Sequence, residues 1–498
     1  MRRDWASVAL GLLLPLVAAA QSLPDFEKRV TEFTLASGLH FIVLERHQAP
    51  VVSFHTYVNA GAVDDPGGKT GLAHMFEHMA FKGTQSIGAK NYPEEKKALD
   101  GIEAVYDKLD SERNLDLRAD PKKIQTLEGE LKAAIDKADS YVDQNAYPRI
   151  IEESGGVGLN AETGEDATSY YYSLPANRIE LWFLMESQRF LAPVLREFYK
   201  ERDVVREERR MRVESNPQGQ LMEVMLGMTF MVSPYRNMPG GWASDIEDLR
   251  VGDARRFFRT YYVPVNIAIA IAGDVQPAEV KRLAEKYFAA LPKAPPPPGV
   301  HTVEPKQEGE RRAEVISKSQ PLLFMAYKRP NQLDKDDPVF DVLSSILATG
   351  RTGLLFKELV RDKRIAVAAG AQASFPGGKY PNAFLLYAVP AVARTVAESE
   401  KACYGIIERL KAEKVDEETL QRIKTEIRAS LIRGLASNAG MAEQLTYYYT
   451  NYGDWRKLFT GIEDINKVTA DDVQRVARQY LTPESRTVVY TVRPEAGK

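Results

Sequence analysis

Apolar runs in the first third of the chain predict β-strands on either side of a helix. Residues 39–44 and 51–58 are rich in β-branched and aromatic side chains, and residues 48–50 between them form a turn signal. An apolar pattern with helical spacing begins near Gly71, and strand-like chain resumes at residues 155–172. The N-terminal part is therefore expected to combine strands with helices.

Two stripes of apolar residues at steps of three and four lie between these strands, on either side of a helix breaker at residues 118–121. The stripes are Leu99, Ile102, Tyr106 and Leu109, followed by Ile124, Leu127, Leu131 and Ala134. They predict two helices that form an inserted antiparallel hairpin over about residues 94–146, with its charged side chains facing solvent.

A proline-rich stretch, residues 292–300, is typical of a semi-rigid polyproline II linker. Before it, long helical patterns cover roughly residues 177–234 and 246–262, and residues 266–272 form a buried-strand run. The linker predicts a boundary between an N-terminal domain, residues 21–291, and a C-terminal domain, residues 301–498.

A weak internal repeat supports two similar halves. With an offset of 219 residues, six positions between Ile246 and Pro264 match their counterparts between Ile465 and Pro483. Both copies are helical patterns that stop before proline and precede an apolar strand. We interpret the repeat as a gene duplication that produced two similar domains.

The charge balance and the cysteine count narrow the possible classes of function. The 498 residues include 66 Lys and Arg against 69 Asp and Glu, a formal net charge of −3. A dedicated nucleic-acid-binding protein normally carries a basic surplus, so we expect no nucleic-acid partner. The single cysteine, Cys403, excludes an intrachain disulfide framework and a metal site built from cysteines. Any metal must therefore be held by histidine and carboxylate side chains.

The N-terminus has the pattern of a secretory signal peptide over residues 1–20. Arg2 and Arg3 precede an apolar run at residues 8–20, which ends in three alanines before Gln21. The run is shorter than the roughly 20 residues that span a membrane, and no later stretch is long enough. We therefore expect a periplasmic or secreted protein with no membrane span after signal cleavage.

Two of the six histidines lie in an H-x-x-E-H pattern formed by His74, Glu77 and His78. Residues four apart share one face of a helix, so both imidazoles can reach one Zn²⁺ ion at bond lengths of about 2.0–2.1 Å. Glu77 borders that face, which suits a carboxylate that takes a proton from water. The alternative is a surface pair of histidines beside a glutamate, but the apolar residues around the motif favour a metal site.

A catalytic zinc site usually has three protein ligands, so a carboxylate is expected to complete this one. At about 100° per residue, Glu201 and Glu208 lie within about 20° of each other on one face of a predicted helix. Glu207 is displaced by about 240° and faces elsewhere. By itself this segment is also compatible with an exposed charged helix that carries Glu–Arg pairs.

These motifs together resemble those of the pitrilysin/insulinase family of zinc peptidases, the inverzincins, including its bacterial processing-peptidase-like members. The matching segments occur in the family's order and are residues 74–84, 156–163, 201–208 and 271–274. The resemblance implies an α+β fold of two duplicated domains, as in the LuxS/MPP-like metallohydrolases. Each domain would be a mainly antiparallel sheet packed with helices, and the two would form a clamshell chamber.

The same resemblance assigns roles to individual residues. Glu77 is implied to be the general base, and Glu201 matches an acidic residue that supports the site. Asn160 matches a residue on the strand edge that receives the backbone of a peptide substrate. The residues implied to bind one Zn²⁺ per chain are His74, His78 and Glu208.

Two features depart from the family's pattern. The inserted hairpin lengthens the spacing from His78 to Glu208, although helical phase and the flanking motifs still select Glu208. In the second half, the family commonly carries an Arg and a Tyr, seven residues apart, that grip substrate. Here Arg361 is present but Ala368 stands at the tyrosine position. We therefore expect an inactive, peptidase-like C-terminal domain that lacks this phenol.

The implied function is that of an exported zinc-dependent endopeptidase acting on peptides or unfolded polypeptide segments. Because Ala368 replaces the tyrosine, we expect the catalytic subunit of a two-subunit enzyme whose paralogous partner carries the Arg/Tyr pair. A homodimer is the alternative to that arrangement. The rival interpretations are a non-catalytic peptide-binding paralogue within a larger assembly and a metal enzyme of a different reaction type.

Overall fold

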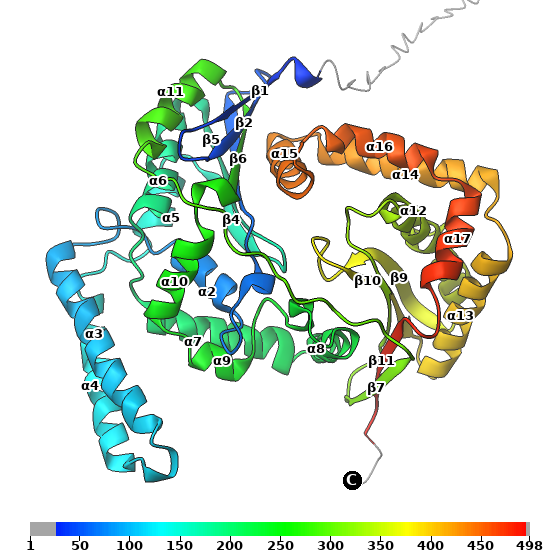
Figure 1. Ribbon diagram of the computed structural model, residues 1–498, viewed down its shortest axis with the longest axis horizontal. Coiled ribbons are helices and arrows are strands. Elements are labelled where there is room, and N and C mark those ends of the chain that lie inside the picture. The colour runs from blue at the N-terminus through cyan, green and yellow to red at the C-terminus, as the bar shows by residue number, and fades with distance from the viewer. Residues whose placement is uncertain (1–25, 495–498) are drawn as a thin grey trace, which may run out of the picture.

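The computed structural model describes residues 26–494, and the predicted signal peptide, residues 1–20, lies outside the described residues. Two β-sheets form the centres of two halves, which face each other like the shells of a clam (Figure 1). Within residues 26–494, no helix is long and apolar enough to cross a lipid bilayer.

Each half is built on one sheet. The first sheet has the order β1 (Val30–Thr34), β2 (His40–Glu45), β6 (Ile267–Gly273), β3 (Val51–Val58), β5 (Thr168–Pro175) and β4 (Val157–Thr163). The second has the order β7 (Arg311–Ile316), β11 (Arg486–Val492), β8 (Leu323–Arg329), β10 (Asn382–Pro390) and β9 (Ala366–Phe375).

The two sheets share one pattern of strand pairing. In the first, β2 and β6 are parallel, and β6, β3, β5 and β4 follow as antiparallel neighbours. In the second, β7 and β11 are parallel, and β11, β8, β10 and β9 are antiparallel neighbours. Strand β1 is an addition at one edge of the first sheet. The shared order confirms the predicted α+β fold with two duplicated, similar domains.

Helices surround both sheets. Those of the first half are α2 (Leu72–Met79), α3 (Tyr92–Arg113), α4 (Pro121–Asp139), α5 (Ala146–Glu153), α6 (Ile179–Leu191), α7 (Phe198–Arg209), α8 (Pro217–Thr229), α9 (Ala243–Glu247), α10 (Val251–Tyr261) and α11 (Pro277–Phe288). Those of the second half are α12 (Asp337–Ala348), α13 (Val396–Ala412), α14 (Glu417–Gly434), α15 (Asn438–Tyr452), α16 (Lys457–Lys467) and α17 (Ala470–Tyr480). The repeated segments are α10 with β6 and α17 with β11.

The helical stretch predicted over residues 177–234 is divided into three helices. Helix α6 ends before Pro193, α7 continues into a π-helical segment at Arg210–Glu214, and α8 begins at Pro217. Proline lacks a backbone N–H and disfavours a helical residue before it, which accounts for the breaks at Pro193 and Pro217. Helices thus cover most of the stretch in which long helical patterns were predicted, and the prolines divide it.

Each half lends a helix to the sheet of the other half (Figure 1). Helix α15 packs on β3 and β6 of the first sheet, where Leu445 shares a buried apolar cluster with Ile42 and Ala270. Helix α8 packs on β11, β7 and β8 of the second sheet, where Leu221 shares a cluster with Phe324. The two halves are therefore joined through their hydrophobic cores.

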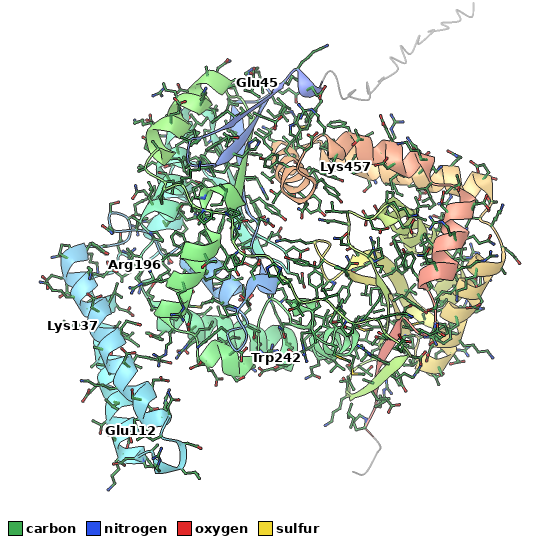
Figure 2. All side chains as sticks on the ribbon, in the orientation of Figure 1. Glu45, Glu112, Lys137, Arg196, Trp242 and Lys457 are labelled. Atoms are coloured by element: carbon green, nitrogen blue, oxygen red, sulfur yellow. The ribbon has the colours of Figure 1, made fainter. Side chains whose placement is uncertain are left out.

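Helices α3 and α4 pack against each other as a hairpin that projects from the first half (Figure 1). Arg196 fixes its root to the rest of the half (Figure 2). The buried Arg196 guanidinium donates to Oε1 and Oε2 of Glu95 at 2.6 and 3.1 Å, and to the carbonyl oxygen of Thr84 at 2.7 Å. The start of α3 is thereby tied to the loop that follows α2.

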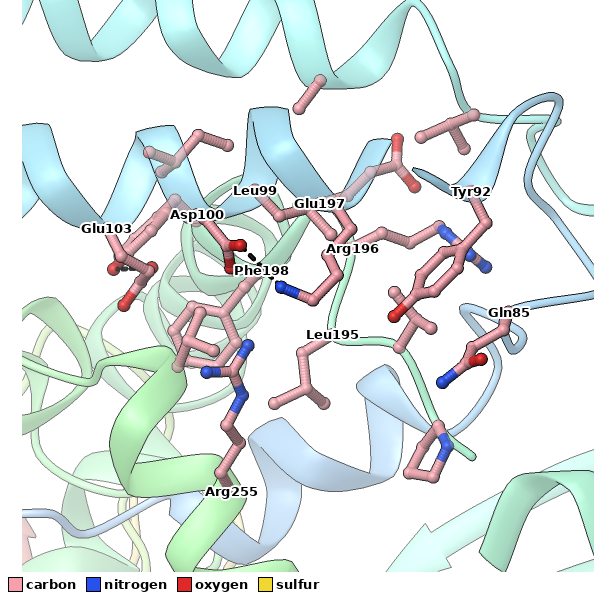
Figure 3. Close-up of a pocket in the computed structure, with 18 of the residues that line it drawn as sticks. Gln85, Tyr92, Leu99, Asp100, Glu103, Leu195, Arg196, Glu197, Phe198 and Arg255 are labelled. Carbon is pink, nitrogen blue, oxygen red and sulfur yellow. Dashed lines mark hydrogen bonds and ion pairs between the residues drawn. The ribbon is translucent and has the colours of Figure 1, made fainter. Parts of the chain in front are cut away.

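A cavity of about 420 Å³ lies at the root of the hairpin (Figure 3). Leu99 and Glu103 of α3 form one wall, Leu195 and Phe198 at the start of α7 form another, and Arg255 of α10 lies opposite. The hairpin therefore contacts the N-terminal end of α7, and α7 itself remains continuous.

Candidate metal centre

Helix α2 carries the H-x-x-E-H motif and is fixed by packing and by a cap. Met75, Phe76 and Met79 are buried in the core of the first half. At the start of the helix, Asp65 accepts hydrogen bonds from the backbone N–H groups of Gly71 at 2.7 Å and Ala73 at 2.8 Å. These bonds satisfy N–H groups that have no partner within the helix. The orientation of the motif is thus set by its own helix.

His74 and His78 converge on Glu208, which α7 places against α2. Nε2 of His74 lies 3.7 Å from Oε2 of Glu208, and Nε2 of His78 lies 3.5 Å from the same oxygen. One ligand atom from each of the three residues lies within 4.8 Å of the others. Ligands at zinc bond lengths in a tetrahedral site are about 3.4 Å apart. The three side chains thus fit a zinc ion with little rearrangement.

The protonation state of His74 also suits a metal ligand. Burial, together with the nearby His78, lowers the pKa of His74 to about 4, so its imidazole is neutral at pH 7. Its buried Nδ1 has no hydrogen-bond partner among the described residues. Neutral imidazole is the form that binds metal, and two histidines with one carboxylate are a known catalytic zinc set.

Glu201 and Lys82 orient His78. Nδ1 of His78 lies 3.3 Å from Oε2 of Glu201, and Lys82 pairs with Glu201 and also with Glu197 at 3.0 Å. Burial alone would raise the pKa of Glu201, but hydrogen bonds from His78 and Lys82 lower it to about 2. A carboxylate on the second ring nitrogen fixes the tautomer of a metal-binding histidine. Sequence reasoning missed Lys82, although residues 78–84 form a family motif.

The two adjacent glutamates of α7 face different surroundings. Oε1 of Glu208 pairs with Arg212 at 2.6 Å, while Oε2 points to the histidines. Glu207 is half-exposed and pairs with Arg210 at 2.8 Å. The helix therefore presents Glu208 to α2 and turns Glu207 away.

Glu77 lies beside this group and is held by β4. Its Oε2 accepts a 2.6 Å hydrogen bond from the Thr163 hydroxyl. Burial raises the pKa of Glu77, and the Thr163 hydrogen bond opposes that rise only in part. A carboxylate with a raised pKa is suited to accept a proton near neutral pH. Sequence reasoning missed Thr163, because it assigned a role only to Asn160 in this strand.

Asn160 and Arg361 lie outside this cluster. Asn160 is exposed on β4, the edge strand of the first sheet, and donates to the Tyr171 hydroxyl at 3.2 Å. Arg361 is exposed in the second half and pairs with Asp362 at 2.6 Å. Ala368 lies on β9, the edge strand that corresponds to β4. Arg361 lies in the π-helical segment Phe356–Asp362 that precedes β9, and it pairs with Asp362 and not with the candidate ligands.

Comparisons with known proteins show which family the chain resembles. The family profile described as Insulinase (Peptidase family M16) matches residues 41–110, and the one described as Peptidase M16 inactive domain matches residues 248–427. Together they take in half of the chain.

Relatives and solved structures match over almost the whole chain. The zinc protease PqqE of Helicobacter pylori is 26% identical over 488 residues, covering 96% of both chains. The crystal structure of a protease from the same organism has a TM-score of 0.77 at 24% identity, covering 93% of this chain and 99% of that one. The periplasmic protease PqqL of Escherichia coli has a TM-score of 0.68 at 14% identity, covering 94% of this chain and 48% of that one. The chain belongs to the pitrilysin/insulinase family of zinc peptidases.

Proposed function

We propose that the chain is an exported zinc-dependent endopeptidase that hydrolyses peptides or unfolded polypeptide segments. The observation that carries this proposal is the convergence of His74, His78 and Glu208 beside Glu77. A site that only bound metal would not need a carboxylate with a raised pKa next to the ligands. Export rests on the apolar run at residues 8–20.

Each residue of the centre has a distinct part in the proposed reaction. Zinc held by the two histidines and Glu208 would polarise the scissile carbonyl and lower the pKa of a water molecule towards about 7. Glu77 would take a proton from the attacking water molecule and later deliver it to the leaving amine. Thr163 fixes one carboxylate oxygen of Glu77, and Glu201 fixes the ring of His78.

The edge strand β4 provides a place for the substrate. Among the strands of residues 26–494 it pairs only with β5, so its outer edge could accept a peptide as an added strand. Asn160 lies on this strand, and Thr163 at its end reaches Glu77. A peptide paired with β4 would therefore run past the carboxylate that accepts the proton.

A second peptidase-like chain is proposed to complete the enzyme. Among the described residues 301–494 no set of His and carboxylate side chains matches the one in the first half, and Ala368 stands where a tyrosine would bind substrate. The chain also covers only 48% of PqqL, whose length would accommodate two such units. We infer that this chain is the zinc-bearing subunit of a pair.

The test is hydrolysis of an unfolded protein and of quenched fluorescent peptides by the purified chain. We expect endoproteolytic cleavage that a chelator abolishes and zinc restores. Glu77→Gln should retain zinc and fold but lose hydrolysis, because an amide cannot accept the proton. Activity that survives both the chelator and Glu77→Gln would contradict the proposal.

The match to a profile named for an inactive domain favours one alternative, a peptide-binding protein without catalysis. The same assay separates the two functions. Saturable binding of the unfolded protein, with no cleavage in the presence of zinc and a paralogous subunit, would establish the alternative.

A further inference from the structure

The turn between β4 and β5, residues 164–167, connects the two halves through Asp166. Oδ2 of Asp166 accepts hydrogen bonds from the backbone N–H groups of Gly378 at 2.7 Å and Lys379 at 3.1 Å. Its Oδ1 accepts one from the Tyr235 hydroxyl at 2.6 Å. The Asp166 carboxylate thus accepts three hydrogen bonds.

Two of the three donors lie in the second half, and the third, Tyr235, packs against it. Gly378 and Lys379 lie in the turn between β9 and β10. Tyr235 is fully buried in the apolar cluster that contains Phe324 of β8. The approach is close, since a Cβ at Gly377 would lie 2.5 Å from Oδ2 of Asp166. The β4–β5 turn of the first sheet therefore packs closely against the second half.

The same turn also borders the candidate metal centre. The residue before it is Thr163, whose hydroxyl donates to Glu77 at 2.6 Å. Within the turn, the carbonyl oxygens of Gly164 and Glu165 accept from the N–H groups of Ala62 at 3.1 Å and Val63 at 2.9 Å. That segment leads to Asp65, the cap of α2. The turn thus lies next to the partner of Glu77 and to the segment before its helix, and a shift of the turn would displace Thr163.

We propose that Asp166 is a positioning residue that holds the β4–β5 turn against the second half and thereby orients Glu77. The inference rests on the proposed peptidase function for its effect on rate. It does not rest on that function for the contact itself. Its consequence is that the proton-accepting carboxylate is aligned only when the two halves are seated on each other.

The first measurement is amide hydrogen exchange in the full chain, which needs no activity. Asp166→Ala should speed exchange in the peptides that cover residues 163–168 and 376–381, while α7 and α14 stay protected. Asp416→Ala is the matched control, because Asp416 also accepts a backbone N–H, from Thr419 at 2.7 Å, but wholly within the second half. Exchange at both turns that equals the wild type would overturn the proposal.

The second measurement is steady-state peptide hydrolysis. Asp166→Ala should lower kcat about tenfold or more, the scale of a lost charge-assisted hydrogen bond, with KM and zinc content unchanged. Asp166→Asn should lose less, because its amide oxygen can accept the same two N–H groups. A chain that exchanges as expected but hydrolyses nothing would defeat the proposed function and leave the contact established.

A double-mutant cycle separates positioning from general destabilisation. If Asp166 acts on Glu77 through Thr163, the Thr163→Val and Asp166→Ala double variant should be no slower than Thr163→Val alone. Asp416→Ala should instead combine independently with Thr163→Val. Losses from Thr163→Val and Asp166→Ala that multiply would show that Asp166 does not act by this route.

Discussion

The Thr163 hydroxyl donates a 2.6 Å hydrogen bond to Oε2 of Glu77, joining the end of edge strand β4 to the helix of the H-x-x-E-H motif. The strand proposed to receive the peptide backbone thus also holds the carboxylate proposed to accept the proton. If both proposals hold, one strand sets the position of the substrate and the position of the base.

Removing this hydrogen bond should slow hydrolysis without removing the metal. Thr163→Val keeps the size of the side chain but cannot donate to Glu77, so the carboxylate loses a fixed orientation. We expect kcat to fall about tenfold or more, on the scale of a hydrogen bond to a charged group. Kinetics and elemental analysis on the same sample test this, and Thr163→Ser, which can still donate, should retain most of the rate.

Loss of either histidine should abolish stoichiometric zinc. His74→Ala or His78→Ala leaves two ligands, fewer than the three protein ligands usual in catalytic zinc sites. Elemental analysis after dialysis should give little zinc in both variants. His47→Ala, at an exposed histidine that pairs with Asp274, is the control and should bind zinc as the wild type does. Full occupancy in both His74→Ala and His78→Ala would defeat the metal assignment.

The glutamates of α7 should differ in their effect on zinc affinity. Glu208→Gln should weaken zinc binding by more than about 100-fold, because a neutral amide is a poor ligand. Glu201→Gln should weaken it about 10–100-fold, as is typical of a residue that supports a ligand. Glu207→Gln should have little effect, since Glu207 pairs with Arg210 on another face. Competition titration with a zinc-binding dye measures all three, and a reversed order of Glu207 and Glu208 would contradict the assignment.

The sequence predicts those parts of the fold and site that depend on local periodicity. His74 and His78 lie together because four residues make about one helical turn, and the same argument separates Glu208 from Glu207. The duplicated α+β fold follows from the internal repeat and from the family motifs, and the strand order confirms it.

Contacts between distant elements cannot be predicted in this way. Thr163 and Glu77 are 86 residues apart in the sequence, and their hydrogen bond depends on how β4 packs against α2. The sequence also does not predict that α8 and α15 each pack on the sheet of the other half, because the apolar face of a helix does not specify which sheet it covers. The helical patterns over residues 177–234 correspond to real helices, and Pro193 and Pro217 mark where these are divided.

The contact between the halves should weaken on acidification, because His55 is buried against α15. Its Nδ1 lies 2.7 Å from the Thr446 hydroxyl, and its ring stacks on Tyr171. Burial lowers the pKa of His55 to about 4, against about 6.5 in an unfolded chain. The unfolded state therefore binds more protons between these values, and stability is lost as the pH falls. From pH 7.5 to 5 the free energy of unfolding should drop by about 2 kcal/mol from this group.

Urea unfolding at several pH values measures that loss. His55→Gln cannot be protonated, so its stability should fall less steeply over the same range. His47→Gln is the control, because the hydrogen bond to Asp274 raises the pKa of His47 rather than lowering it. An equally steep decline in His55→Gln would show that other groups cause the acid sensitivity.

The last prediction concerns the missing tyrosine. The first half carries the three candidate ligands and Glu77, but the side chain of Ala368 on β9 offers no hydrogen-bond donor to a substrate carbonyl. A positioned donor of this kind is worth about 2.7–4 kcal/mol in the transition state. The isolated chain should therefore be slow, about 10²-fold or more below a complete enzyme. Co-expression with a paralogue that carries the Arg/Tyr pair should raise the rate by that factor.

Two variants show which chain supplies the substrate-binding pair. Arg361→Ala in this chain should change the activity of the pair little, because Arg361 is exposed and bound to Asp362. Replacing the tyrosine of the paralogue by phenylalanine should return the rate to that of the isolated chain. If the isolated chain is already fast and the paralogue leaves its rate unchanged, another residue replaces the tyrosine and the chain acts alone or as a homodimer.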